Sequence, residues 1–264
     1  MLAAPDESSE IPANALIAGI ALATWGLALA LAVTGWGSGA HHQPPADPAG
    51  STAPALVLFL LAWQVMTAAM MLPSSLPLIR LFNRASRGQA HPRLARLAFM
   101  TAYFVVWTGF AALALIGDAV LHDLARRWLW LAERPWLIGG VVLLLAGGFQ
   151  FSPLKDRCLR QCRSPFGFLR RHYRRGMAAA WALGMRHGLF CLGCCWALML
   201  TMTAVGVGQL AWMAALTGVM AAEKSWRWGR RLTPLVGVAL LLWGALVLIQ
   251  PTWLPAPMNP AARR

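Results

Sequence analysis

The sequence predicts an all-α, polytopic transmembrane helix bundle, and three observations lead to this fold class. The 264 residues are 58% hydrophobic and only 12% charged, whereas soluble domains carry about 25% charged residues. The apolar residues fall in long runs, nearly free of charge, that are long enough to cross about 30 Å of hydrocarbon. The basic residues, which give a formal net charge of +14, lie in the short connections between those runs. A lipid bilayer is therefore the expected partner of this chain, and nucleic acid is not.

Seven apolar runs define the expected helices. The first follows a short tail, residues 1–13, that contains no Lys or Arg, so we expect a retained helix rather than a secretory signal. The fourth and sixth runs are short for a full span, and six spanning helices are expected if one of them is re-entrant. A Pro-rich tail, 251–264, ends the chain. The expected helices of the transmembrane domain (14–250) are 14–35, 55–79, 94–121, 135–151, 177–202, 208–222 and 232–249.

The distribution of Lys and Arg predicts the orientation of the bundle. The connections after the second, fourth and sixth helices hold 17 of the 23 basic residues. The positive-inside rule therefore places the N-terminus in the cytoplasm. The longest basic stretch follows Pro153 and is too polar to cross a membrane. Its Phe166, Phe168 and Leu169 are expected to hold it at the membrane surface.

The expected fifth helix carries the sharpest local feature of the sequence. Residues three and four apart share one helix face, so nitrogen and sulfur donors would form a single seam along it. Thiolate and thioether donors favour Cu(I), with Zn(II) as the second candidate. Packing is the alternative, because Cys and Met are also common in buried helices, and for the methionines of this seam it is the leading interpretation. The seam consists of His187, Cys191, Cys194, Cys195, Met199 and Met202.

Two further groups extend the candidate metal site. Met66 and Met70 lie one helical turn apart just ahead of Pro73, where a kink would free backbone carbonyl groups. These thioethers would complete a copper site on the fifth helix, although plain packing explains them equally well. Cys158 and Cys162 would share a face if their basic stretch is helical, and they would form a cytoplasmic entry site for metal. Two incidental thiols are the alternative for this pair.

Arg186 is unusual because it lies about ten residues inside an apolar run, where a guanidinium is costly unless it is paired or close to the interface. Either the fifth helix begins later than expected or Arg186 has an acidic partner. Glu223, at the inner end of the sixth helix, is the expected partner.

Several of these residues together resemble a bacterial family of predicted metal-binding integral membrane proteins. The stretches that carry the resemblance are Met70-Met71-Leu72-Pro73-Ser74, Pro153-Leu154-Lys155 with Cys158 and Cys162, Arg163-Ser164-Pro165, Gly193-Cys194-Cys195-Trp196 and Glu223-Lys224. The similarity extends from about the second expected helix to the seventh, and Cys191 to Met199 is its most specific part. The resemblance implies metal binding but little about mechanism.

Three functions follow from these features. The first is a multi-pass protein of the bacterial inner membrane that handles a soft metal, moving copper or supplying it to a cuproenzyme, with a copper chaperone as another partner. The second is a thiol–disulfide protein in which Cys191 and Cys194, spaced as Cys-x-x-Cys, cycle between dithiol and disulfide. The third is a structural subunit in which the cysteines only pack. An enzyme is not expected, because the sequence has no Walker loop, no triad and no His-Glu-x-x-His segment.

Overall fold

The computed structural model describes residues 52–134, 136–205 and 209–253, with residue 19 and the short pieces 22–27 and 29–30. Every regular element in these residues is helical, which confirms the predicted all-α class. The predicted N-terminal tail, 1–13, most of the expected first helix and residues 254–264 of the predicted C-terminal tail, 251–264, lie outside the described residues. The helices are α3 (Thr52–Ala85), α4 (Pro92–Arg127), α5 (Leu129–Ala132), α6 (Trp136–Phe149), α7 (Pro153–Arg163), α8 (Pro165–His172), α9 (Met177–Val205), α10 (Leu210–Ser225), α11 (Gly229–Ile249) and the 3-10 turn η2 (Pro251–Trp253).

Four of the described helices are long and apolar enough to cross a membrane. These candidate spans are Leu56–Ala85, Pro92–Leu121, Met177–Met202 and Gly229–Ile249. Helices α6 and α7 meet the same criterion only as a pair, and they are bent by 65° relative to each other. Helix α10 has 16 residues, about 24 Å at 1.5 Å per residue, which is less than the hydrocarbon thickness. The fourth and sixth expected helices are therefore short in the structure, as the sequence predicted.

The basic stretch after residue 151 folds into two helices that pack against the bundle. Ser152 caps α7, because its Oγ accepts a hydrogen bond of 3.1 Å from the backbone N–H of Lys155, and Pro153 suits the first helical position. The expectation that Phe166, Phe168 and Leu169 all face the membrane surface was wrong. Phe168 and Leu169 are buried in a core shared with α3, α4 and α9, and only Phe166 remains exposed.

Glycines allow the long helices to approach one another closely. Gly184 and Gly188 lie one turn apart on α9 and face α4. A Cβ atom on Gly184 would collide with the carbonyl oxygen of Phe99, and one on Gly188 would lie 3.0 Å from the Cβ atom of Val106. Such close contact replaces the hydrophobic driving force that helices lack in lipid. It fixes α9 against α4, and Cys191, one turn after Gly188, contacts Tyr103 of the same helix α4.

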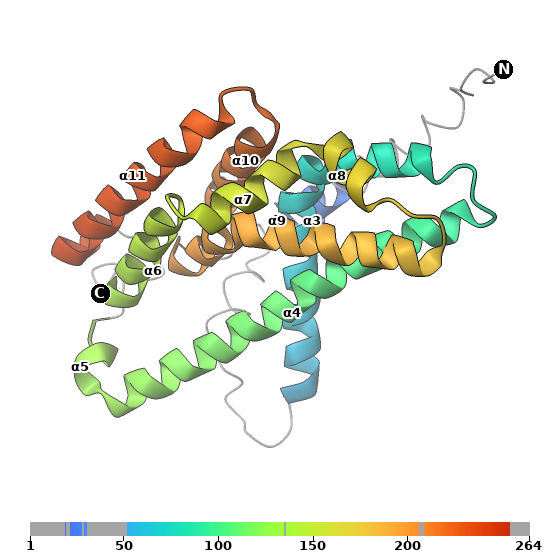
Figure 1. Cartoon of the computed structure of the whole chain (residues 1–264). Coiled ribbons are helices and arrows are strands. Elements are labelled where there is room, and N and C mark those ends of the chain that lie inside the picture. Colours follow the sequence, from blue (N-terminus) through green and yellow to red (C-terminus); the bar gives the residue numbers. More distant parts are fainter. Residues whose placement is uncertain are drawn as a thin grey trace.

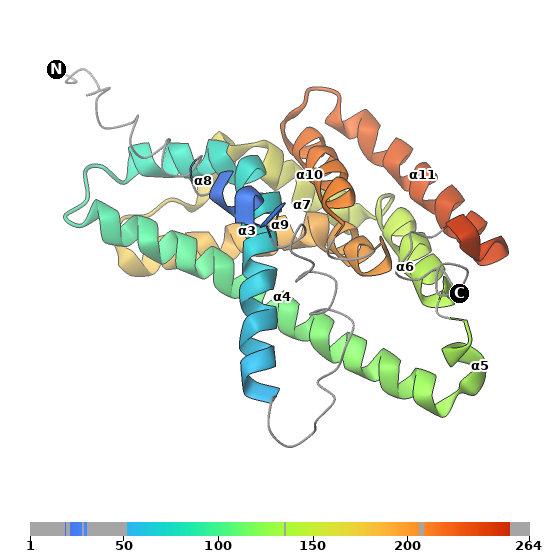
Figure 2. The ribbon, with the colours of Figure 1, turned by 180° about the vertical axis from the view of Figure 1, so that it is seen from behind.

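Helix α3 changes direction sharply part-way along its length (Figures 1 and 2). Pro73 and Pro77 lie inside this helix, and proline leaves the carbonyl four residues earlier without its helical donor. For Pro73 that carbonyl belongs to Ala69, which instead accepts a hydrogen bond of 3.1 Å from the indole Nε1 of Trp25. This hydrogen bond attaches Trp25 to α3 directly before the Met-Met-Leu-Pro stretch.

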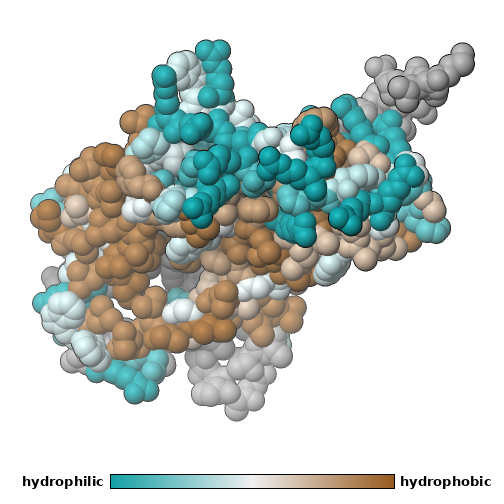
Figure 3. All heavy atoms as spheres, viewed as in Figure 1, coloured by the Kyte–Doolittle hydropathy of each residue, from teal (hydrophilic) through white to brown (hydrophobic). Residues whose placement is uncertain are grey.

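Polar and apolar side chains are segregated over the surface. On the face in Figure 3, hydrophilic residues gather along the edge that carries α7, α8 and the connection between α10 and α11, and hydrophobic residues cover α6, α11 and much of α4. The basic connections therefore lie towards one edge of the bundle, as the distribution of Lys and Arg predicted. The cytoplasmic location of that edge stays a prediction.

Candidate metal centre

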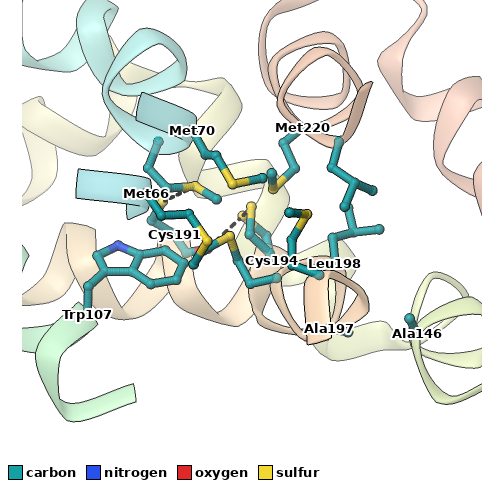
Figure 4. Close-up of a cluster of buried hydrophobic side chains, with 14 of the residues drawn as sticks. Met66, Met70, Trp107, Ala146, Cys191, Cys194, Ala197, Leu198 and Met220 are labelled. Carbon is teal, nitrogen blue, oxygen red and sulfur yellow. Dashed lines mark hydrogen bonds between the residues drawn. The ribbon is translucent and has the colours of Figure 1, made fainter. Parts of the chain in front are cut away.

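Sulfur-containing side chains converge where α3, α7, α9 and α10 meet, and we call this group the sulfur cluster. Its members are Met66, Met70 and Met71 of α3, Cys158 and Cys162 of α7, Cys191, Cys194, Cys195 and Met199 of α9, and Met220 of α10. All are buried except Cys162, which is half-buried. Figure 4 shows side chains from three of these helices, including Met70, Cys194 and Met220, directed toward one region.

Cys194 lies at the centre of the thiols. Its Sγ is 3.3 Å from the Sγ of Cys195 and 3.8 Å from the Sγ of Cys162. Two sulfurs bound to one ion at about 2.3 Å in tetrahedral geometry lie about 3.8 Å apart, so Cys162 and Cys194 already have the separation of a ligand pair. Helical structure across Cys158 and Cys162 is confirmed. The predicted entry site, Cys158 and Cys162, and the predicted site on α9 were expected as separate sites. In the structure they are in contact, because Cys162 lies beside Cys194.

Cys191 has a mixed set of neighbours from three helices. Its Sγ lies 4.0 Å from the Sδ of Met71, 3.2 Å from the hydroxyl of Tyr103 and 3.3 Å from the Nζ of Lys224. The same ammonium donates to Ser74 Oγ at 3.1 Å and lies 3.7 Å from Met71 Sδ. Within the part of the chain that the structure describes, no carboxylate pairs with Lys224. A buried cation needs compensation by polar or charged groups. The ammonium of Lys224 has two sulfur atoms and one hydroxyl as its neighbours.

The adjacent acidic residue has a different partner from the one expected. Glu223 Oε2 accepts a hydrogen bond of 2.7 Å from Lys155 Nζ, and both side chains are only 1% exposed. The expectation that Glu223 pairs with Arg186 was therefore wrong. The ion pair joins α7 to α10. On α7, Lys155 lies three residues before Cys158, and on α10, Glu223 directly precedes Lys224. The ion pair fixes the two helices that close the sulfur cluster.

The remaining predicted donors are buried but differ in their contacts. His187 lies in the same seam of α9, yet its Nε2 is 3.3 Å from Ser75 Oγ and its ring stacks on Tyr103 at 5.3 Å between centroids. It therefore adjoins the partner of Cys191 rather than a thiol. Met66, Met70 and Met199 are buried in the core that contains the thiols.

Gly193 determines how closely α7 approaches α9. A Cβ atom at this position would lie 2.6 Å from the Sγ and 3.4 Å from the Cβ of Cys158. Cys158 therefore packs into the space that the missing side chain leaves. One turn further along α7, this contact brings Cys162 to Cys194.

Gly193→Val is expected to separate Cys162 from Cys194, because its branched side chain would displace α7. The measurement is oxidative cross-linking in a background that replaces Cys191 and Cys195 with Ser but keeps Cys158, because the new side chain collides with that residue. Peptide mass spectrometry should find the Cys162–Cys194 disulfide readily in the parent protein and several-fold less in the variant. Gly218→Val is the matched control, since nothing lies within 4 Å of a Cβ atom there. Equal cross-linking in both variants would contradict this account.

The donor set fits copper better than a metal held by hard ligands. In the described residues, no three side chains of His, Cys, Asp or Glu form a group that could hold a metal ion by themselves. The sulfur cluster instead combines thiols with methionine thioethers. That combination matches Cu(I) and offers little to Mg²⁺ or Ca²⁺.

Comparison with known protein families agrees with this chemistry. Residues 60–247 match the family model PpoB2, described as a copper chaperone. The chain belongs to this family. No curated protein matches the chain, and no solved structure matches it. Membership of a copper chaperone family confirms copper handling in general, and the match includes α7, α9, α10 and most of α3.

Four residues to which the sequence pattern gave no site role belong to the sulfur cluster or contact it. These are Met71, Tyr103, Met220 and Lys224. Met71 and Lys224 belong to stretches that carry the family resemblance, which was the available signal. Tyr103 and Met220 lie on helices with no other candidate ligand, so nothing in their local sequence marks them.

Proposed function

We propose that this copper chaperone holds Cu(I) at the sulfur cluster, inside the bacterial inner membrane, and passes it to a cuproenzyme or another copper-binding protein. One observation carries the proposal. Helices α3, α7 and α9, which are separated in the sequence, bring thiols and a thioether together at one buried place, with sulfur–sulfur separations of 3.3, 3.8 and 4.0 Å. We assign Cys191, Cys194 and Cys195 as the principal ligands, with Met71 and Cys162 beside them.

Soft donors favour Cu(I) over Zn(II) at this site. Structural zinc sites are closed cages of four Cys or His ligands, and the described residues provide no such cage. Thioethers add nothing to a zinc site, whereas they are good ligands for Cu(I). We therefore expect Cu(I) as the cargo and Zn(II) as a weaker competitor.

Lys224 supplies a counter-charge for the bound ion. A Cu(I) ion held by the three thiolates has a net charge of −2, which is costly in a buried site. The ammonium of Lys224 lies 3.3 Å from Cys191 Sγ, so it reduces the net charge of the site to −1. This arrangement explains why a buried lysine is tolerated without a carboxylate partner.

Cys162 gives the cluster a connection to the outside. It is the half-buried thiol of the group and lies 3.8 Å from the buried Cys194. Copper could pass between these thiols by exchange of one ligand at a time, without ever being released as a free ion. We propose Cys162 as the residue through which copper enters or leaves.

Thiol–disulfide chemistry is the second candidate function, and one contact favours it. The Sγ atoms of Cys194 and Cys195 are only 3.3 Å apart, and all five cysteines are free thiols. This function would require an electron acceptor that removes two electrons and two protons from the dithiol. It predicts a reversible disulfide in the purified protein and no stoichiometric metal.

The test is copper content after loading with Cu(I) under reducing conditions. The protein purified in detergent should retain close to one copper per chain by elemental mass spectrometry. Replacing Cys191, Cys194 and Cys195 together with Ser should reduce this at least tenfold. Cys158→Ala is the matched control and should keep its copper, because that thiol packs against Gly193.

Two other results would overturn the proposal. Absence of retained copper from every protein tested, together with a disulfide among the α9 cysteines, would favour the redox function. Equal copper in the wild-type protein and the triple variant would place the ion elsewhere. In that case the cysteines would be packing residues, as in a structural subunit.

A further inference from the structure

A basic pocket lies at the junction of α8 and α9, away from the sulfur cluster. Its volume is about 160 Å³, and its polar lining comes from Arg171, His172, Arg174 and Arg186. The rest of the wall is formed by small and aliphatic side chains of α9. Arg171 and His172 end α8, Arg174 lies in the connection, and Arg186 reaches the pocket from the third turn of α9. Residues from two helices thus place three guanidinium groups around one hollow.

The three arginines have no acidic counterpart in the described structure. The ion pairs recorded there join Arg127 to Asp123, Lys155 to Glu223 and Arg160 to Asp156. None involves an arginine of the pocket, and no carboxylate lines it. His172 is the fourth polar residue of the lining, and an imidazole brings no negative charge; its Nδ1 donates a hydrogen bond of 2.9 Å to the carbonyl oxygen of Phe168. The lining of the pocket therefore carries a concentrated positive charge.

The position of Arg186 argues for an anion within reach of the membrane. It is exposed on the surface of α9, nine residues after Met177, where the candidate span begins. Nine residues correspond to about 14 Å along a helix, and the headgroup layer on one side of a bilayer is only about 5–8 Å deep. An exposed guanidinium this far along a spanning helix is costly unless it extends to the interface and finds a partner there. That interface is expected on the side of Arg171 and Arg174, which precede α9 in the polar segment before the span.

We propose that this pocket binds the phosphate of an anionic phospholipid. A phosphodiester presents oxygens that match the planar donors of Arg, and basic pockets between membrane helices are suited to acidic headgroups. The small side chains of α9 beside the pocket leave room for the glycerol and the start of an acyl chain. The lipid would neutralise Arg186 and hold α8 against α9. This site accounts for Arg186, whose expected partner Glu223 pairs with Lys155 instead, and it does not depend on copper.

The test compares lipid binding by the delipidated full-length protein and two triple variants. Native mass spectrometry with phosphatidylglycerol should show one tightly bound lipid on the wild-type protein. Replacing Arg171, Arg174 and Arg186 with Gln should weaken that binding at least tenfold. The control variant replaces Arg80, Arg157 and Arg230, which are exposed elsewhere on the protein, with Gln. It removes the same number of positive charges and should change lipid binding by less than twofold.

Two further arms identify the ligand and check the fold. Phosphatidylcholine should bind at least tenfold more weakly than phosphatidylglycerol, and millimolar inorganic phosphate should not displace the lipid. The charge-conserving variant Arg186→Lys should retain most of the binding if the pocket is intact. Equal loss in the pocket and control variants would overturn the proposal in favour of general electrostatic attraction. Displacement by inorganic phosphate would overturn it in favour of a soluble anion.

Discussion

Lys155→Met is expected to lower the free energy of unfolding by about 3–5 kcal/mol, because it leaves the carboxylate of Glu223 buried and unpaired. Both partners are 1% exposed, and the ion pair joins α7 to α10 across 68 positions of sequence. The second carboxylate oxygen, Oε1, has no hydrogen-bond partner among the residues that the structure describes. Removing Lys155 would therefore leave the whole charge without compensation.

The measurement is unfolding of the detergent-solubilised protein, followed by helicity as a denaturing detergent is added. The double variant Lys155→Met with Glu223→Leu should recover most of the lost stability, because apolar replacement of a buried pair is often neutral. Asp156→Asn breaks the exposed pair with Arg160 on the same helix, whose side chains are 50% and 56% exposed, and should cost less than about 1 kcal/mol. A double variant as unstable as the single one would show that the pair is not the origin of the effect.

Lys224→Met is expected to weaken Cu(I) binding at least tenfold, which corresponds to about 1.4 kcal/mol. Two charges about 4 Å apart interact by about 4 kcal/mol at an effective dielectric constant near 20, so a larger loss is within reach. The variant removes the ammonium that lies 3.3 Å from Cys191 Sγ and adds a thioether of similar length. The added thioether would favour Cu(I) binding and so oppose the loss of charge, which makes the expected tenfold loss a lower bound on the contribution of the charge.

Competition against a chromophoric Cu(I) chelator measures this affinity. Lys224→Arg keeps the charge and should lie between the wild-type protein and Lys224→Met. Arg227→Met removes an exposed charge three residues further along and should change the affinity by less than twofold. Unchanged or tighter binding in Lys224→Met would sink the counter-charge role while leaving the sulfur ligands themselves in place.

Hydropathy was sufficient to predict the helical membrane class because a bilayer requires each spanning segment to satisfy its own backbone hydrogen bonds. The candidate spans in α3, α4, α9 and α11 each overlap an expected helix. Hydropathy did not predict that residues 152–176 pack against the bundle with Phe168 and Leu169 buried. Their polarity is compensated by contacts distant in the sequence, such as Lys155 with Glu223, and no local average can detect such a contact.

The candidate site was predictable only along a single helix. Helical periodicity placed His187, Cys191, Cys194 and Met199 on one seam, and the structure buries that seam. It could not show that Cys162 of α7 reaches Cys194, since that contact depends on the absence of a side chain at Gly193.

The sequence by itself determined the class of this protein: a helical membrane bundle with soft ligands clustered on one helix, a charge distribution biased toward one side and a family resemblance that implies metal binding. Only the tertiary structure decided which ligands meet, that Lys224 rather than Glu223 faces the thiols, and that Arg186 joins Arg171 and Arg174 at a separate pocket. The physical reason is that local order follows from short-range periodicity and from the solvent. Pairing between buried charges and sulfurs instead depends on how distant helices pack, through glycine contacts and a proline bend.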